Sequence, residues 1–515
     1  MLFRPSLHKR IALPLLASLS AALGGCVVGP NFQRPVPPAV SSYMPTADIP
    51  MSPDNGISIQ QLKPGAVVPS EWWRMFRSPE LNKLVQKAQR ANPNIEAALH
   101  TLAQAKQELR EVGGTYMPQV DGGADARRQN GPPFALGIRP DHTLPTYGLY
   151  TVGATVSFTP DVFGLTARRV ERQAAQVENR RYQMAALQLS VTGNVVDQAL
   201  KLAAAKQQIA IAADMVETDE LILSLARQLE ASGKVSTTSI WLAQEQLDTD
   251  RATIPPLRNQ TATAVIALAT LVGQPPAAWK ATSLTLDALT LPTELPVSMP
   301  SQLVRQRPDI LAAEARLHAA SASVGVADAE MYPQFTLSAS TGTAALAVQA
   351  LGSGSSVVWT LISGLTAPIF RGGTLAAQRQ AAINHFDSEL ALYRASVLQG
   401  LEQVAGVLQA IRTDEQLASA TQGAWKATQA QQQLEWQRYR SGKVSLLEWL
   451  KSSRNTQRAH LAYVQTAVRR YHDSADLMVA LGGYWPLNEE LGSCPSEARE
   501  RPVPGCLLPD QPQSP

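Results

Sequence analysis

The chain has 515 residues, a formal net charge of +3 and only 17% charged residues. No basic run with interleaved aromatic residues occurs, so we do not expect nucleic acid as a partner. The seven histidines are scattered, and the chain contains no HExxH motif, no paired Cys-x-x-Cys motif and no phosphate-binding glycine loop. We therefore expect neither an enzyme nor a protein with a bound cofactor or metal ion.

A processing signal opens the chain. Basic residues precede a short apolar stretch over residues 11–22, and Leu23-Gly24-Gly25-Cys26 follows. This stretch is too short for a stable membrane helix and is typical of a secretory signal peptide over residues 1–25. Small residues directly before a cysteine are typical of a lipobox, which predicts that Cys26 becomes the lipidated first residue of the mature protein. An ordinary signal peptide with an incidental cysteine is the alternative.

Two further segments lack regular periodicity. Residues 26–70 are rich in proline, serine and glycine, and they predict an extended, lipidated N-terminal tether. Residues 486–515 form a proline-rich tail, in which Cys494 and Cys506 could pair as a disulfide or stay as free thiols. No later apolar run approaches the roughly 20 residues of a membrane helix, so a membrane-spanning part of the mature chain must consist of strands.

The rest of the chain is a duplication. Asn92-Pro93-Asn94-Ile95 is repeated in similar form as Arg307-Pro308-Asp309-Ile310, at an offset of 215 residues. Ser232-Gly233-Lys234-Val235-Ser236 is repeated as Ser441-Gly442-Lys443-Val444-Ser445, at an offset of 209. Units of this length are domain-sized rather than solenoid repeats. We divide the chain into repeat 1 (71–275), a linker (276–300) and repeat 2 (301–485).

Each repeat is predicted to contain a helical segment and then two strands. In repeat 1, helical periodicity runs from about Leu81 to Val112 with a break at Asn92-Pro93, and a segment from Pro118 to Phe158 follows. Apolar and small polar residues alternate over residues 150–158, and the same alternation recurs at 335–340 before a second strand-like run at 357–366. Such strands either cover a soluble core or separate lipid from a watery lumen.

A very long helix follows the strands. Residues 165–231 contain no proline and only one glycine, which predicts a helix of roughly 100 Å. A heptad seam with a four-residue stutter runs along this helix, formed by Val170, Val177, Met184, Val191, Val195, Leu202 and Ile209. The helix should end at Gly233, and a returning helix should begin within a few residues. Pro255-Pro256 must bend or end the returning helix in repeat 1, whereas repeat 2 has no equivalent prolines.

The number of strands predicts an oligomer. Two strands in each repeat give four per chain, which is too few to close a barrel, and open strand edges are not tolerated in lipid. We therefore expect a mixed α and β membrane protein in which several chains close one barrel, with the long helical hairpins forming a second tube beneath it.

Several dispersed motifs carry a family resemblance. They are Trp72-Trp73-Arg74-Met75-Phe76, Pro79-Glu80-Leu81, Asn92-Pro93-Asn94-Ile95, Tyr116-Met117-Pro118-Gln119, Asp161-Val162-Phe163-Gly164 and Arg438-Tyr439-Arg440-Ser441-Gly442. The chain from about 71 to 485 resembles the TolC-like outer-membrane factors, and best their lipidated NodT-like or OprM-like branch. The resemblance implies a homotrimer with a 12-stranded outer-membrane β-barrel and a periplasmic α-helical barrel. It also implies a Gram-negative host, a periplasmic adaptor and an inner-membrane pump of the resistance-nodulation-division or major-facilitator type, which together expel small molecules.

The resemblance further implies roles for the hairpin tips and for the helix after the second tip. Adaptor contacts map onto Gly233, Lys234, Val235, Ser236, Gly442, Lys443, Val444 and Ser445, which also have the form of helix caps. Relatives close the periplasmic end with leucine, aspartate and arginine, and this chain has Leu447, Lys451 and Arg454 at those positions. With a lysine in place of the acid, the gate is expected to use Leu447 packing and pairing of Glu448 with Lys451 or Arg454, unless Glu448 serves only as part of a capping box.

Two other functions stay open at this point. Related ducts also serve type I secretion of polypeptides, and a non-transporting structural lipoprotein could use long coiled coils as spacers. Two alternating strands in each repeat argue against a spacer. The cargo is not determined by the chain, because substrate choice is normally made by the inner-membrane pump.

Overall fold

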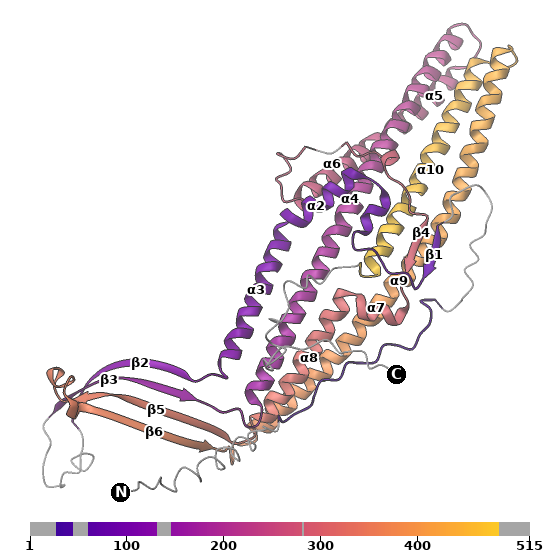
Figure 1. The fold of residues 1–515 in the computed structure, drawn as a ribbon. Coiled ribbons are helices and arrows are strands. Elements are labelled where there is room, and N and C mark those ends of the chain that lie inside the picture. Colours follow the sequence, from indigo (N-terminus) through magenta and orange to yellow (C-terminus); the bar gives the residue numbers. More distant parts are fainter. Residues whose placement is uncertain (1–26, 45–59, 131–145, 281–282, 484–515) are drawn as a thin grey trace, which may run out of the picture.

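The computed structural model describes residues 27–44, 60–130, 146–280 and 283–483. The predicted signal peptide, Cys26, Cys494 and Cys506 lie outside the described residues. The protein is an elongated rod with a small sheet at one end and two helical hairpin tips at the other (Figure 1). No helix among the described residues is long and apolar enough to cross a membrane.

The two repeats contribute the same main elements in the same order. Repeat 1 contains η1 (Trp72–Phe76), α2 (Pro79–Ala91), α3 (Pro93–Gly114), β2 (Gln119–Gln129), β3 (Tyr147–Phe158), α4 (Leu165–Ala231), α5 (Thr237–Arg251) and α6 (Ile254–Leu271). Repeat 2 contains α7 (Pro300–Gln306), α8 (Pro308–Ala329), β5 (Gln334–Ala345), β6 (Val357–Thr366), α9 (Thr374–Arg440) and α10 (Leu446–Ala480). The linker holds η3 (Leu286–Ala288) and β4 (Glu294–Val297), and two short 3-10 turns, η4 (Val348–Ala350) and η5 (Gly354–Ser356), join β5 to β6.

The predicted strands pair as one antiparallel sheet in the order β2-β3-β5-β6. Directly paired residues lie on the same face, and the register places Val156 opposite both Val120 and Ala339, with Ala339 opposite Leu361. This face is mainly apolar. The other face is mainly polar or small, as in the row that joins Asp121 of β2 to Thr155 of β3. The alternation predicted from the sequence is therefore confirmed as two chemically different faces of one sheet.

The two repeats meet along β3 and β5 at a pair of glycines. Gly153 lies opposite Gly342, and a Cβ atom added to Gly342 would lie 2.4 Å from the carbonyl oxygen of Val152. A side chain at this position cannot be accommodated without moving backbone atoms. The pair therefore fixes how closely the two halves of the sheet approach.

The long helices begin and end where the sequence predicts. α4 runs from Leu165 to Ala231, and α9 has the same length of 67 residues. All residues of the predicted seam in α4 are buried or half-buried. α5 ends at Arg251 and α6 begins at Ile254, immediately before Pro255-Pro256, whereas α10 continues unbroken to Ala480. The prolines therefore make the two halves of the rod unequal, as predicted.

The N-terminal tether contains a strand that the sequence analysis missed. β1 (Gln61–Pro64) pairs in parallel with β4, beside the helical rod (Figure 1). Leu295 and Val297 of β4 are buried in the main hydrophobic core, together with Trp72, Phe76 and Leu477. Before β1, the hydroxyl of Tyr43 donates to the carbonyl oxygen of Ser298 at 2.8 Å. This part of the tether is therefore built into the fold.

Candidate functional site

The two hairpin tips have the same backbone geometry. In the first tip Gly233 has φ +70°, the amide of Lys234 donates to the carbonyl oxygen of Leu229 at 2.9 Å, and the amide of Gly233 donates to that of Glu230 at 2.7 Å. In the second tip Gly442 has φ +71°, and two corresponding bonds close the end of α9. This is the Schellman C-cap, in which a left-handed residue satisfies the last carbonyl groups of a helix.

The glycines also leave an open surface. A Cβ atom built on Gly233 or Gly442 would meet no atom within 4 Å. The left-handed backbone alone explains why glycine is favoured at these positions. The neighbouring Lys234 and Lys443 are exposed, and Val235 and Val444 are half-buried. Each tip therefore presents backbone, one cation and part of one apolar side chain to its surroundings.

The tips differ in how the returning helix begins. In the second tip the Oγ of Ser445 accepts from the amide of Glu448 at 3.2 Å, and Glu448 Oε2 accepts from the amide of Ser445 at 2.9 Å. These bonds form a capping box, and the bond from the Ser445 amide to the carboxylate of Glu448 lowers the pKa of Glu448. In the first tip Ser236 occupies the same position but makes no side-chain capping bond. An aromatic group that includes Trp436 and Trp449, with ring centroids 4.8 Å apart, joins α9 to α10 near the second tip.

The predicted gate residues do not form one cluster. Leu447 is half-buried, Glu448 and Lys451 are exposed, and the carboxylate of Glu448 is engaged by Ser445. Arg454 does not pair with Glu448. Its Nε lies 3.0 Å from Asp219 Oδ1 of α4, and its Nη2 lies 2.5 Å from Asp250 Oδ2 of α5. Glu448 therefore serves in the capping box, the alternative that the sequence offered, and Arg454 pairs with Asp219 and Asp250 instead of Glu448.

Asp219, Asp250 and Arg454 form a buried charged cluster between the two hairpins. The side chains of Asp219 and Asp250 are 2% and 7% exposed, and that of Arg454 is 14% exposed. Burial, together with hydrogen bonding to Asp250, raises the pKa of Asp219 to about 7, against the attraction of Arg454. One guanidinium therefore bridges two carboxylates, and proton uptake by Asp219 relieves their repulsion.

The sequence analysis missed the two aspartates. Asp219 lies between the buried residues Met215 and Ile222 of α4, and an acid on a predicted apolar face is the signal that could have found it. Asp250 gives no comparable signal, because it precedes the proline break.

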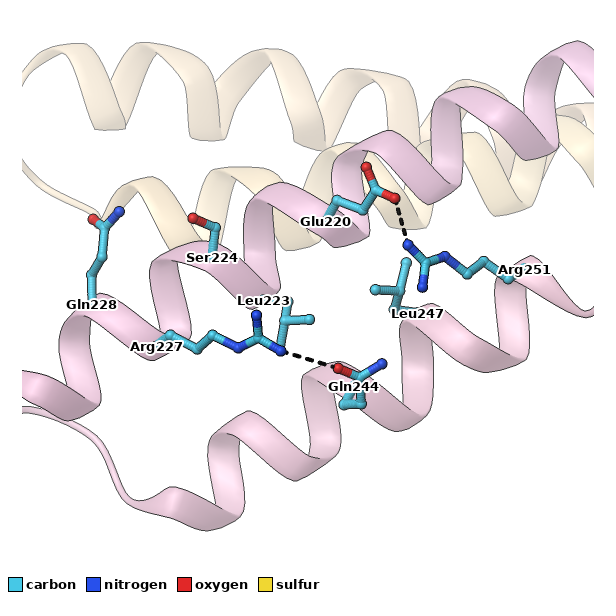
Figure 2. A pocket seen from close by; sticks show the side chains of 8 residues that line it. All are labelled: Glu220, Leu223, Ser224, Arg227, Gln228, Gln244, Leu247 and Arg251. Atoms are coloured by element: carbon cyan, nitrogen blue, oxygen red, sulfur yellow. Dashed lines mark hydrogen bonds and ion pairs between the residues drawn. The ribbon is translucent and has the colours of Figure 1, made fainter.

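A hollow of about 470 Å³ lies next to this cluster, between α4 and α5 (Figure 2). Leu223 and Leu247 line it together with polar side chains, and Arg251 pairs with Glu220 across it at 2.6 Å. Arg227 reaches Gln244 at 3.4 Å on the side nearer the tip. On this side of the first hairpin, polar pairs therefore act together with the buried Leu223 and Leu247 to hold α5 against α4.

Comparisons with known proteins identify the type of molecule to which these features belong. A family model described as outer membrane efflux protein matches residues 84–274 and 299–483. The chain belongs to the outer membrane efflux protein family. The pyoverdine export outer membrane protein OpmQ of Pseudomonas putida is 30% identical, over 82% of this chain and 90% of its own length. The outer membrane protein OprJ of Pseudomonas aeruginosa is 27% identical, over 91% and 95%.

Solved structures agree with this family assignment. The structure of the outer-membrane channel OprN has a TM-score of 0.78 and is 27% identical, covering 89% of this chain and 100% of that chain. The open state of the Neisseria gonorrhoeae MtrE channel has a TM-score of 0.75 at 22% identity, which supports the fold alone. The protein is an outer-membrane channel subunit of a tripartite efflux system in a Gram-negative bacterium, and its family consists of channels rather than enzymes.

Proposed function

We propose that three copies of this efflux channel subunit close one 12-stranded barrel and one helical tube beneath it. The observation that carries this proposal is the open sheet. β2 and β6 are its two edges, and each has one side without a partner strand in the described chain. Unpaired backbone groups are costly in lipid, so β6 of one copy is expected to pair with β2 of the next. The apolar face would then contact lipid, and the polar face would line the lumen.

The helical part supports the same assembly. Only seven of the 67 residues of α9 are buried, whereas exposed leucines, among them Leu398, Leu417 and Leu434, lie along this helix. Exposed apolar side chains that recur along one helix can together form an interaction surface. A neighbouring copy is the occupant that follows from the open sheet, because an edge-to-edge joint at the strands brings the attached long helices side by side.

The two tips are the proposed contact sites for a periplasmic adaptor. They lie at the end of the rod opposite the sheet, which would place them towards the inner membrane (Figure 1). An adaptor would bind Gly233, Lys234, Val235 and Ser236 in one tip and Gly442, Lys443, Val444 and Ser445 in the other. An inner-membrane pump of the resistance-nodulation-division or major-facilitator type would supply the cargo.

Substitution of Gly442 tests this contact. Gly442→Leu should abolish efflux, because the leucine side chain would project from the tip into the proposed adaptor contact. The trimer should still insert. Gly442→Asn should keep most of the activity, since asparagine tolerates the left-handed backbone. Gly65→Leu is the matched control, because Gly65 also has a left-handed backbone, with φ +79°, and its Cβ would also enter open space, away from the tips. Normal drug tolerance in cells with Gly442→Leu and a normal trimer would contradict the proposal.

We also propose that Leu447, Glu448, Lys451 and Arg454 belong to the periplasmic constriction, with different tasks. Leu447 would narrow the opening, Glu448 would fix the start of α10, and Arg454 would hold α10 to the first hairpin. The exposed Lys451 would then give the opening a ring of positive charge. Single-channel recordings of Lys451→Asp in bilayers should show higher cation conductance and block by divalent cations. Unchanged conductance and unchanged block would remove Lys451 from the gate.

The proposed cargo is a small molecule, and Cys26 is proposed as the lipid-modified anchor. The relatives OpmQ and OprJ, both outer membrane proteins, favour efflux over type I secretion, and OpmQ is described as exporting pyoverdine. Restoration of drug tolerance in an efflux-deficient host, compared with secretion of a polypeptide substrate by the same strain, separates the two tasks. Heat-modifiable migration of a trimer extracted from outer membranes would exclude a structural spacer. Mass spectrometry of the N-terminal peptide tests lipidation of Cys26.

A further inference from the structure

The first described residues of the mature chain are held by one buried arginine. Arg168, in the first turn of α4, is 3% exposed. Its Nε donates to the carbonyl oxygen of Val28 at 3.0 Å, and its Nη2 donates to that of Gly29 at 2.9 Å and to Asn31 Oδ1 at 3.0 Å. Its Nη1 donates to Glu171 Oε2 at 2.7 Å. Three of these four acceptors belong to the N-terminal segment, so this segment satisfies most of a buried guanidinium.

The backbone of the segment lies unusually close to both repeats. A Cβ atom on Gly29 would lie 2.5 Å from the Cα of Gly325 in α8, and one on Gly325 would lie 2.7 Å from Arg168 Cδ. A Cβ atom on Gly164, before α4, would lie 2.8 Å from Val27 Cγ1. Gly164 and Gly325 therefore leave the space that the segment and Arg168 occupy.

Further contacts continue along α8 in the direction away from the sheet. The ring of Phe32 stacks on His318, with centroids 4.4 Å apart, and Arg34 pairs with Glu314 at 2.6 Å. His318 Nε2 lies 3.0 Å from Glu171, which links this contact back to Arg168. Burial opposes ionisation of Glu171, but hydrogen bonds from His318 and Arg168 outweigh it and lower the pKa of this group. Residues 27–34 thus bind a continuous site formed by α4 of repeat 1 and α8 of repeat 2.

This site adjoins the junction between strand and helix. The amide of Val28 donates to the carbonyl oxygen of Phe163 at 3.2 Å, and the ring of Phe163 stacks on that of Tyr332, which precedes β5. Asp161 caps α4 by accepting from the amides of Thr166 and Ala167. The Asp161-Val162-Phe163-Gly164 motif therefore starts α4 and receives the N-terminal segment at the same place.

We propose that residues 27–34 are a docking segment and that Arg168 is the positioning residue that holds the lipid attachment point beside the strand-to-helix junction. The lipid anchor and the sheet then enter the membrane as one unit. Repeat 1 and repeat 2 are held together at the same junction between strands and helices. This inference rests on the lipidation of Cys26 proposed above. Without docking, the lipid would be attached through a loose chain and would no longer define the depth of the sheet.

Two unrelated substitutions should release the segment. Arg168→Gln removes most of the donors, whereas Gly325→Ala leaves every donor in place and fills the space that Gly29 and Arg168 need. Alanine is otherwise favoured over glycine inside a helix, so Gly325→Ala would stabilise α8 if the segment had no role. Arg169→Gln is the matched control, because Arg169 is half exposed and pairs with Glu330 at 3.2 Å.

Hydrogen exchange of the full-length protein in detergent measures docking, and the amount of heat-modifiable trimer in outer membranes measures assembly. Arg168→Gln and Gly325→Ala should raise the exchange rate of residues 28–32 at least tenfold and lower the amount of trimer several-fold, while Arg169→Gln matches the wild type. Unchanged exchange in both variants, or fast exchange with a full amount of trimer, would overturn the proposal. Cys26→Ser separates the docking of residues 27–34 from the lipidation of Cys26. In this variant the lipid is absent, but hydrogen exchange of the docked segment should stay slow.

Discussion

α4 and α9 have the same length and equivalent places in the two repeats, yet their surroundings differ. In α4, 25 of 67 residues are buried, because α3, α6, α8 and α10 all pack on this helix. In α9 only seven are buried, in a single stripe from Tyr393 to Ala418 that faces α8 and α10. The uncovered face of α9 carries leucines rather than charges alone. One helix is therefore the core of the chain, and the other is the surface against which we expect a second copy to pack.

The hairpin tips differ in a similar way. The two tips share the Ser-Gly-Lys-Val-Ser sequence and the same C-cap, but only the second adds a capping box and a group of aromatic rings. The first hairpin is interrupted after Arg251 and depends on Arg454 of the other repeat to neutralise its buried aspartates. Similar local sequence thus gives similar turns, whereas the strength of each hairpin depends on its neighbours.

The largest difference between the two long helices should appear when a leucine of each helix is replaced. Leu202 of α4 is fully buried, so Leu202→Ala should lower the free energy of unfolding by about 2 to 5 kcal/mol. Leu398 of α9 is 65% exposed in the single chain, so Leu398→Asp should leave the secondary structure intact and remove the trimer. Circular dichroism and size in detergent measure the two effects. A stable trimer with Leu398→Asp would show that no copy covers this face.

The link between the hairpins should be the next most sensitive position. Arg454→Met leaves two buried aspartates without their cation and should cost about 3 kcal/mol, measured by chemical unfolding in detergent. Adding Asp219→Asn and Asp250→Asn should recover most of the loss, because neutral side chains do not need the guanidinium. If the single variant is as stable as the wild type, Arg454 does not hold α10 to the first hairpin.

The same cluster predicts a dependence of stability on pH. Burial raises the pKa of Asp219 to about 7, so between pH 4 and 7 the folded protein keeps a proton that the unfolded chain releases. The contribution of Asp219 therefore falls as pH rises through this range, on the order of 2 kcal/mol between pH 5 and 8. Asp473, whose pKa burial also raises to about 7, acts in the same direction. The contribution of Asp219 is the difference between the free energies of unfolding of wild type and Asp219→Asn, measured as a function of pH. Parallel curves for the two proteins would contradict this prediction.

The smallest effect compares the two serines that begin the returning helices. Ser445→Ala removes a side-chain cap and should cost about 1 kcal/mol, whereas Ser236→Ala should change stability by less than about 0.5 kcal/mol. Local hydrogen exchange at the start of α10 and of α5 reports both changes. Equal effects at the two tips would mean that the capping box contributes nothing.

Sequence reasoning was most reliable where the signal is local. The bounds of α4, the break before Pro255, the left-handed glycines and the strand alternation all depend on residues within a few positions of one another. The pairing of β1 with β4 was missed because Gln61 and Glu294 are far apart in the chain and each strand has only four residues. Leu295 and Val297 of β4 share one core with residues of α10 and η1, which no periodicity within the linker reveals.

The gate residues illustrate the same limit. Leu447, Glu448, Lys451 and Arg454 were placed on the correct helix, and the capping box of Glu448 was recognised from its spacing. The partners of Arg454 were not found, because Asp219 and Asp250 reach its side chain only when repeat 1 packs against α10. Arg168 was likewise not identified, because three of its acceptors belong to residues 28–31, which are far from it along the chain.

The sequence by itself determined the duplication, the order of the elements, the length of the rod and the family. These follow from periodicity, glycine and proline positions and motif order, which act over short distances along the chain. Only the tertiary structure decided which long helix is the core, which carboxylates share Arg454 and where residues 27–34 bind. Those outcomes depend on which surfaces meet, and a buried charge is stable only beside the partners that the complete fold brings to it.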